Sequence, residues 1–323
     1  MTPTATVART TAPPSSAVVW ANLGVVYVVW GSTYVGIRLL VETIPPLLGA
    51  SARFLVAGIV MLAFLAARGR SIRASRGALL GAAVVGLLLP ACGNGLVTVA
   101  EQDVPSGLAA LLIATIPLWV VVLRATIGRE RVGAPTYAGV ALGLLGLAVL
   151  LLPGSRPAAA GLGSMTLLLV AALGWATGSY ISPRLAMPAD RLVAVAWQLV
   201  FGGLALAIAA VLAGEPSDLD VGAISLRSWA GLAYLITFGS WLAYTAYNWL
   251  LGNVRISKVA TYAYVNPVVA VILGFLILGE GIATTALVGA ALVIAAVVVI
   301  VRTESRTSAP QQRRTSGFTG PDR

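Results

Sequence analysis

Long apolar runs recur along almost the whole chain, and they constrain its fold more than any other feature. The runs begin near residue 18 and end near residue 301. Several reach about 20 residues, the length that an α-helix needs to cross the hydrocarbon core of a bilayer. Backbone groups in lipid must be satisfied internally, and helices do this within one segment. The sequence therefore predicts an all-α membrane protein with many spans.

The composition agrees with a bilayer rather than water as the main surroundings. Only 10% of the residues are charged, the mean hydropathy is +0.93 and histidine is absent, whereas a soluble domain carries roughly 25% charged residues. A pI of about 10.5 raises nucleic-acid binding as a hypothesis. The basic residues lie in short loops beside apolar spans, so we expect no nucleic-acid partner. Cys92 is the only cysteine, which excludes an internal disulfide.

We predict ten transmembrane helices. They cover residues 18–40, 46–67, 77–99, 105–126, 134–152, 161–183, 190–213, 229–250, 257–278 and 283–301. The first span has no small-residue cleavage site at its end, so we expect it to be retained rather than removed as a signal peptide. The polar segments 1–17 and 302–323 are expected to be disordered tails, the second of them basic.

The basic residues indicate how the chain is oriented. If the N-terminus is cytoplasmic, most of the 21 Lys and Arg residues fall on the cytoplasmic side, among them four arginines between residues 68 and 76. The outer loops then hold Arg156 and Arg227. Because Lys and Arg are retained on the cytoplasmic side, we expect a multi-pass protein of the cell (inner) membrane with both termini in the cytoplasm.

The two halves of the chain carry the same pattern. Residues 97–132 align without a gap with residues 247–282, at a constant shift of 150 positions. A proline and a glutamate recur at matching places: Pro117 with Pro267, and Glu130 with Glu280. We therefore predict two repeats, residues 18–152 and 161–301. Each holds five spans, an odd number, so the second repeat enters the membrane from the opposite side, as in secondary transporters.

The matched helices end in loops of different charge. The first loop, "GRERV" (128–132), holds Arg129 and Arg131, and the second, "GEGIA" (279–283), has Gly279 and Gly281 at the matching positions. The predicted inversion explains the exchange, because only the first loop is cytoplasmic. The shared glutamates are then marks of common origin and loop structure rather than catalytic groups.

Three long motifs in the sequence resemble those of a known protein family. "WGSTYVGIRLLVETIPPLLGASARFLVAG" (30–58), "GNGLVTVAEQDVPSGLAALLIATIPLW" (93–119) and "SKVATYAYVNPVVAVILGFLILGE" (257–280) together resemble the EamA-type drug/metabolite transporter superfamily, and within it the YedA-like exporters. The resemblance covers roughly residues 18–301. It implies two EamA repeats, a ten-helix inner-membrane fold with both termini inside, and efflux of small metabolites or drugs, with the substrate left open.

Polar and aromatic side chains cluster on one sector of several predicted spans. A polar group facing lipid is costly, so these residues are expected to face the bundle interior. At about 100° per residue, Trp30, Thr33 and Tyr34 share a sector of the first helix. We predict a central substrate cavity. Its predicted lining is Trp30, Thr33, Tyr34, Asn94, Trp175, Ser179, Tyr244, Asn248, Tyr262 and Asn266.

Other roles stay open for these residues. Ser, Thr and Asn commonly bridge helices, and Trp and Tyr also mark membrane interfaces, so the same side chains can hold helices together. Pro117 and Pro267 each remove a backbone hydrogen bond near mid-depth. Their matched positions suit hinges or broken helices of a transporter. Static kinks are the alternative.

Arg53 is the most unusual side chain, because it lies about two turns into the second helix. An unpaired arginine at the bilayer centre costs about 2.5–3.5 kcal/mol on insertion scales. Glu101 and Glu42 lie at comparable depth near the outer side. A structural ion pair, with Glu101 as partner, is the favoured interpretation. A gate or an anion-binding role is the alternative.

The sequence predicts a secondary transporter that exports small metabolites, amino acids or drug-like amphiphiles by alternating access around a midplane cavity. Uptake or exchange by the same fold is an alternative, and a membrane enzyme or a scaffold is a different class. We expect no catalytic residues, metal or cofactor. No Gly-Lys-Ser/Thr loop for ATP is present. The expected partners are a small-molecule substrate and the lipid bilayer, with a homodimer left open.

Overall fold

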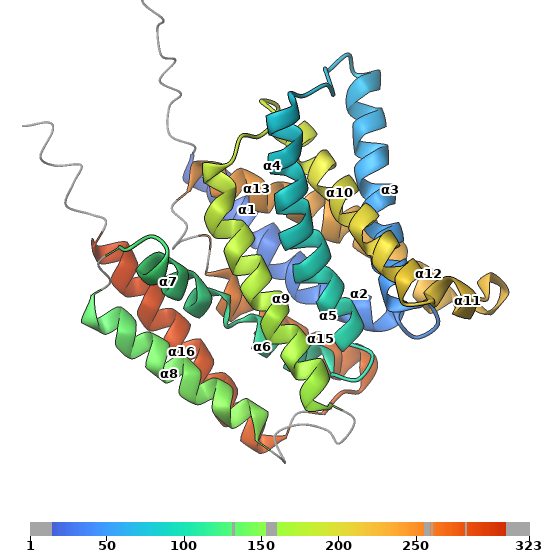
Figure 1. Cartoon of the computed structure of the whole chain (residues 1–323). Helices are drawn as coiled ribbons and strands as arrows, with labels where there is room; N and C mark the ends of the chain where they lie inside the picture. Colours follow the sequence, from blue (N-terminus) through green and yellow to red (C-terminus); the bar gives the residue numbers. More distant parts are fainter. Residues whose placement is uncertain are drawn as a thin grey trace, which may run out of the picture.

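The computed structural model describes residues 15–130, 133–152, 160–254, 259, 261–281 and 283–307. The described chain forms the predicted ten-helix membrane bundle (Figure 1). Six helices are long and apolar enough to cross a membrane, and Ala134–Leu150, Val265–Leu278 and Thr284–Ile300 are shorter apolar helices. Most of both predicted tails, residues 1–14 and 308–323, and Arg156 lie outside the described residues.

The first five helices occupy residues 16–151. The first consists of α1 (Ser16–Val25), a π-helical segment (Val26–Trp30) and α2 (Gly31–Leu40), and the second is α3 (Pro46–Ala67). The third joins α4 (Arg76–Gly86), a π-helical segment (Leu87–Gly95) and α5 (Leu96–Ala100). The fourth is broken into α6 (Ser106–Ile113) and α7 (Ile116–Thr126), and the fifth is α8 (Ala134–Leu151).

The second set begins at Leu162. It opens with α9 (Leu162–Ile181), a 3₁₀ turn (Ser182–Arg184) and α10 (Arg191–Leu212), followed by the short elements α11 (Glu215–Asp218) and Val221–Ala223. The eighth membrane helix joins α12 (Leu226–Tyr234), a π-helical segment (Leu235–Ala243) and α13 (Tyr244–Asn253). The last two are α15 (Tyr262–Leu278) and α16 (Thr284–Thr307). Helix α16 runs beyond residue 301, where the sequence predicted its end.

Polar residues in the loops fix where several helices start. Ser75 accepts a hydrogen bond from the Ala78 N–H at 3.2 Å at the start of α4, and an N-cap of this kind stabilises a helix by about 1 kcal/mol. At the opposite end of the bundle, two glutamates of the second repeat cap helices of the first. Glu215 accepts from the Leu48 N–H at 2.8 Å at the start of α3, and Glu280 accepts from the Ser106 N–H at 3.2 Å. These caps join the repeats.

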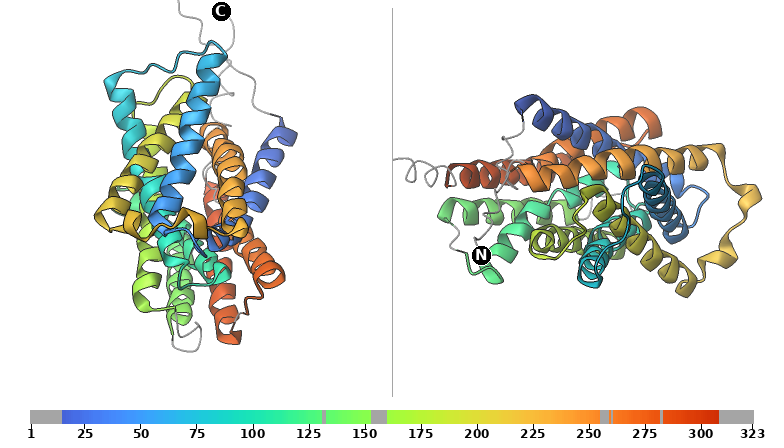
Figure 2. Two further views of the ribbon diagram at one scale, coloured as in Figure 1. Left: turned by 90° about the vertical axis from the view of Figure 1, so that its right-hand side faces the viewer. Right: turned by 90° about the horizontal axis from the view of Figure 1, so that it is seen from above.

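Equivalent helices of the two repeats pair with each other. Figures 1 and 2 show α8 running beside α16, and α3 packs along α10. The other contacts are exchanged symmetrically: α9 packs on the third helix of the first repeat, and α2 packs on α12 of the second. Both third helices carry a π-helical segment. The arrangement is that of two inverted five-helix repeats.

Glycines let the paired helices approach to backbone contact. A Cβ atom at Gly146 of α8 would lie 2.9 Å from the carbonyl oxygen of Gly289 on α16. A Cβ atom at Gly58 of α3 would lie 2.8 Å from the carbonyl oxygen of Ala196 on α10. Close packing replaces the hydrophobic effect as a driving force between helices in lipid, so these glycines stabilise the pairing of the repeats.

The matched loops have the same backbone geometry at the position where arginine and glycine are exchanged. Arg129 and Gly279 both adopt a left-handed conformation, with φ of 49° and 67°. The next residue closes the turn in each repeat: the Glu130 N–H donates to the Arg124 carbonyl at 3.0 Å, and the Glu280 N–H to the Gly274 carbonyl at 3.1 Å. The exchange therefore alters backbone strain as well as charge.

Substitutions at these two positions are expected to change stability in opposite directions. Arg129→Gly relieves the left-handed strain and raises the free energy of unfolding by about 1 kcal/mol, whereas Gly279→Ala lowers it by about the same amount. Thermal unfolding of the purified protein in detergent measures both. Gly281→Ala is the matched control, since Gly281 has open space around its Cβ position. Equal effects at Gly279 and Gly281 would contradict the assignment of strain.

Candidate functional site

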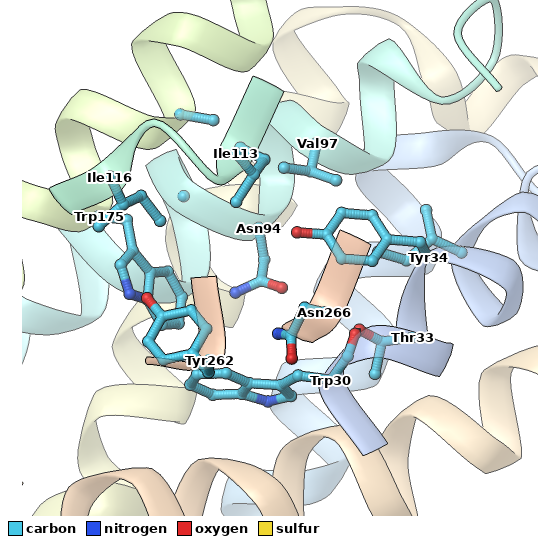
Figure 3. Close-up of a pocket in the computed structure, with 13 residues that line it drawn as sticks. Trp30, Thr33, Tyr34, Asn94, Val97, Ile113, Ile116, Trp175, Tyr262 and Asn266 are labelled. Atoms are coloured by element: carbon cyan, nitrogen blue, oxygen red, sulfur yellow. The ribbon is translucent and has the colours of Figure 1, made fainter. Parts of the chain in front are cut away.

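A small cavity lies between the two repeats, with a volume of about 50 Å³ (Figure 3). Side chains from both repeats line it. The lining residues are Trp30, Thr33, Tyr34, Ile37, Gly93, Asn94, Val97, Ile113, Ile116, Ala171, Trp175, Tyr262 and Asn266. These residues come from the first helix and from the third, fourth, sixth and ninth membrane helices. The cavity therefore occupies the interface that the inversion creates.

Most of the predicted cavity residues lie in this lining, and three do not. Trp30, Thr33, Tyr34, Asn94, Trp175, Tyr262 and Asn266 face the cavity. Ser179 shares a hydrogen bond of 2.9 Å with the Tyr247 hydroxyl, and the Tyr244 hydroxyl donates to Gln198 Oε1 at 2.8 Å. Asn248 Nδ2 donates to the Tyr244 carbonyl at 2.9 Å. In this conformation Ser179, Tyr244 and Asn248 therefore make contacts within and between helices and do not line the cavity.

An aromatic cluster closes the cavity toward the end of the bundle at which α1 begins. The Trp30 ring lies 5.3 Å from Trp175, 4.7 Å from Tyr247 and 5.5 Å from Tyr262, measured between centroids. The Trp30–Trp175 and Trp30–Tyr262 pairs are edge to face, a geometry that favours aromatic contact. Tyr247 lies behind this layer. The aromatic cluster, Trp30, Trp175, Tyr247 and Tyr262, therefore separates the cavity from Ser179.

The polar groups of the cavity are neutral. In Figure 3 the Tyr34 hydroxyl and the carboxamides of Asn94 and Asn266 point toward the centre of the cavity. When its amide is oriented to satisfy its neighbours, Asn266 donates to the carbonyls of Tyr262 and Tyr27 at 3.3 and 3.1 Å, which leaves its Oδ1 as an acceptor. Trp175 Nε1–H has no hydrogen-bond acceptor among the described residues. The cavity thus offers donors and acceptors without a fixed charge.

Arg53 and Glu101 are both buried outside the cavity. Arg53 on α3 is 3% exposed, and its Nε donates to Ser240 Oγ at 2.9 Å, while Nη1 has no partner among the described residues. Glu101 follows α5 and is 0% exposed, and neither of its carboxyl oxygens has such a partner. The structure does not bring the two side chains within salt-bridge distance. The predicted ion pair is thus not formed in this conformation.

A larger pocket opens at the end of the bundle opposite the start of α1. This vestibule has a volume of about 490 Å³ and is lined by Arg38, Val41, Glu42, Gln102, Pro105, Arg227, Leu278 and Glu280. The charged side chains that line the vestibule form salt bridges or hydrogen bonds. Arg227 pairs with Glu42 at 3.3 Å, and Glu280 accepts from Ser106 Oγ at 2.7 Å. Arg38 donates to the carbonyls of the Glu101 turn. The vestibule and the cavity are therefore separated by the turn that contains Glu101.

The two matched prolines occupy different places in their helices. Pro117 lies in the first turn of α7, after the break at Ala114 and Thr115, where a missing N–H interrupts no helical bond. Pro267 lies inside α15 and removes a helical bond there. Neither side chain lines the cavity, but their neighbours Ile116 and Asn266 do. A role as hinges stays a prediction.

Sequence reasoning missed two kinds of residue at this site. Ile37, Val97 and Ile113 line the cavity with apolar side chains, and apolar residues in a span carry no signal that separates the cavity from lipid. Tyr247 of the aromatic cluster was not among the predicted cavity residues, although at about 100° per residue it shares a sector of the eighth helix with the predicted Tyr244. That shared sector was a signal that could have identified it.

The fold and the site define a polytopic membrane transporter. Two inverted five-helix repeats enclose a cavity between them, and a vestibule lies at one end of the bundle. Transporters with inverted repeats place their substrate site at the repeat interface.

Comparison with known proteins gives the family. The model of the EamA-like transporter family matches residues 16–152 and 162–302. The chain is 40% identical over 275 residues, 85% of this chain, to the uncharacterized inner membrane transporter YedA of Escherichia coli (strain K12), of which it covers 87%. The chain belongs to the EamA-like transporter family, and it is therefore a membrane transporter.

Two further similarities are more distant. The chain is 26% identical over 285 residues to a probable amino-acid metabolite efflux pump of Salmonella typhimurium (strain LT2), covering 84% of this chain and 90% of that protein. A protein of known crystal structure superposes with a TM-score of 0.63 at 17% identity, covering 92% of this chain and all of its own. The second similarity shows a shared fold.

The unpartnered indole N–H of Trp175 allows a test of the cavity with a close control. Trp175→Phe keeps an aromatic ring and removes the N–H, so a solute that hydrogen-bonds there should lose about two- to tenfold in apparent affinity. Trp119→Phe removes another buried N–H without a partner among the described residues, outside the cavity lining. Both variants should unfold near the wild-type temperature. Equal transport defects in the two variants would argue against a role for the cavity.

Proposed function

We propose that this protein is a secondary transporter that exports small metabolites, amino acids or drug-like amphiphiles by alternating access. The observation that carries the proposal is the cavity of aromatic and neutral hydrogen-bonding groups at the interface of the inverted repeats. Aromatic faces suit the apolar part of a small solute, and the carboxamides of Asn94 and Asn266 suit its polar part. A cavity without fixed charge favours neutral, zwitterionic or amphipathic cargo.

The size of the cavity supports a cycle with more than one conformation. A volume of about 50 Å³ holds a few water molecules, so a metabolite requires the helices around it to separate. The aromatic cluster blocks the end at which α1 begins, and the vestibule approaches from the other end. We propose that the cavity opens alternately to the vestibule and, past Trp30 and Trp175, to the opposite side of the membrane. The break between α6 and α7 and the region of Pro267 would be the hinges of this movement.

The distribution of charge supports an orientation with both termini in the cytoplasm. Arg70 in the loop before α4 pairs with Asp190 before α10 at 2.6 Å, so these basic loops lie at one end of the bundle. Arg68 and Arg73 belong to the first of these loops and Arg191 begins α10 after the second, whereas Arg227 lies at the vestibule. By the positive-inside rule, the vestibule faces the outside.

Fusions to two reporter proteins test the orientation. Alkaline phosphatase, which is active outside the cytoplasm, should be inactive when joined to the C-terminus and active when joined after Asp220. A green fluorescent protein at the C-terminus should fluoresce. Phosphatase activity at the C-terminus would contradict the proposed orientation.

Transport itself is tested first in cells and then with the purified protein. Cells that overproduce the protein should release at least one metabolite faster than cells that lack it. Proteoliposomes should then move that metabolite down its gradient, and Trp30→Ala or Trp175→Ala should lower the flux by about three- to tenfold, as expected for the loss of one aromatic contact with the solute. The yield and the thermal unfolding temperature of each variant control for folding. Undiminished flux in both alanine variants would remove the cavity from the transport path.

Uptake or exchange is the alternative within the same fold, because alternating access is reversible. The relative named as an efflux pump favours export. The comparison of cells with and without the protein distinguishes the two, since an uptake protein would deplete the medium of the solute instead of enriching it.

A further inference from the structure

The turn that contains Glu101 lies between the vestibule and the cavity. The next residue, Gln102, lines the vestibule, and Val97, one helical turn before Glu101, lines the cavity. Arg38 donates to the carbonyls of both Glu101 and Gln102, which ties this turn to α2. A change in the state of Glu101 can therefore reach both pockets through α5 (Leu96–Ala100).

The Glu101 carboxyl is fully buried and has no hydrogen-bond partner for either oxygen among the described residues. An ionised carboxylate without a hydrogen bond is very costly in such a site, whereas the protonated form has no net charge to desolvate. The geometry of this conformation therefore suits the protonated acid.

Charged and titratable groups on several elements interact electrostatically with Glu101 or its neighbours. Arg38 and Tyr34 come from α2, Arg53 from α3, Glu280 from the segment after α15, and Tyr234 of α12 faces Arg53. On the same turn, Asp103 accepts a hydrogen bond from Ser164 of α9 at 2.8 Å. The guanidinium groups of Arg38 and Arg53 favour an ionised Glu101, but neither contacts its carboxyl oxygens here.

Glu101 lies just outside the span Arg76–Ala100. Burial raises the pKa of its carboxyl well above the usual range, and Glu280 raises that pKa further, while Arg38 and Arg53 act in the opposite direction. The neutral acid therefore persists at pH values where an exposed glutamate is ionised, and it ionises as the pH rises. The raised pKa of Glu101 agrees with the burial of its carboxyl group and its lack of hydrogen-bond partners among the described residues.

We propose that the Glu101 carboxyl is a proton-binding site that controls the opening of the cavity, and that it couples proton movement to transport. In the structure described here the site holds its proton. When the vestibule turn opens, the proton passes to water in the vestibule, and the carboxylate left behind pairs with Arg53 or Arg38. In this proposal the turn has two states: in one the Glu101 carboxyl is neutral and unpaired, and in the other it is ionised and paired with an arginine. The coupling part of the proposal rests on the proposed transport function.

Infrared spectroscopy tests the proton directly and needs no solute. The wild-type protein at pH 7 should show the carbonyl stretch of a protonated carboxylic acid, shifted in heavy water. Glu101→Gln should lose this band. Asp103→Asn is the matched control, because it removes an exposed acid from the same turn, and it should keep the band. If Glu101→Gln does not fold, Glu101→Asp should shift the band. A band unchanged by both Glu101 substitutions would overturn the proposal.

Quenching of tryptophan fluorescence by acrylamide tests the link to the cavity. Trp30 and Trp175 are buried in the cavity wall, so quenching should increase as the pH rises and Glu101 ionises. Glu101→Gln should lose this pH-dependent component, and Asp103→Asn should retain it. Persistence of the component in Glu101→Gln would overturn control by Glu101. Because neither assay uses a transported solute, their failure leaves the flux measurements as a separate test of the transport function.

Discussion

The hydrocarbon core of the bilayer dictates where this chain can place its polar groups, and the pairing of the two repeats follows from that constraint. Lipid offers no hydrogen bonds, so polar side chains within the spans must meet other protein groups or a cavity. Glycines at the contacts of α3 with α10 and α8 with α16 bring the backbones together. The interface between the repeats then collects the aromatic and carboxamide groups of the cavity.

This constraint also explains the caps and the buried charges. Glu215 and Glu280 of the second repeat close the open N-termini of α3 and α6 in the first, where backbone N–H groups would otherwise lack partners. Among the described charged residues, Arg53 and Glu101 retain buried polar atoms without a hydrogen-bond partner. A soluble protein can leave such a group to water. Glu101 precedes Gln102 of the vestibule, and the proposed opening of this turn would bring its carboxylate to Arg53 or Arg38.

The sequence predicted the helices, the inversion and much of the cavity, because each leaves a strong periodic signal. Trp30, Asn94 and Asn266 were identified as polar or aromatic residues within apolar spans, and they line the cavity. Ser179 and Tyr244 carry the same signal and lie elsewhere, since helical periodicity gives the angle around an axis but not the depth at which an aromatic layer closes. The break at Ala114 lies just before Pro117, and Pro90 lies within the π-helical segment Leu87–Gly95, so prolines mark these two irregularities in the sequence. The π-helical segments Val26–Trp30 and Leu235–Ala243 contain no proline, and nothing in the sequence predicted them.

The central claim is that the cavity opens to one side of the membrane at a time. Single cysteines at Ile37, on the vestibule side of the cavity, and at Ser179, beyond the aromatic cluster, can be introduced with Cys92→Ser and labelled in vesicles with a membrane-impermeant maleimide. The account predicts that Ile37→Cys reacts only from outside and Ser179→Cys only from the cytoplasmic side, and that the exported metabolite changes the two rates in opposite directions. Rates that rise or fall together, or labelling of one position from both sides, would contradict it.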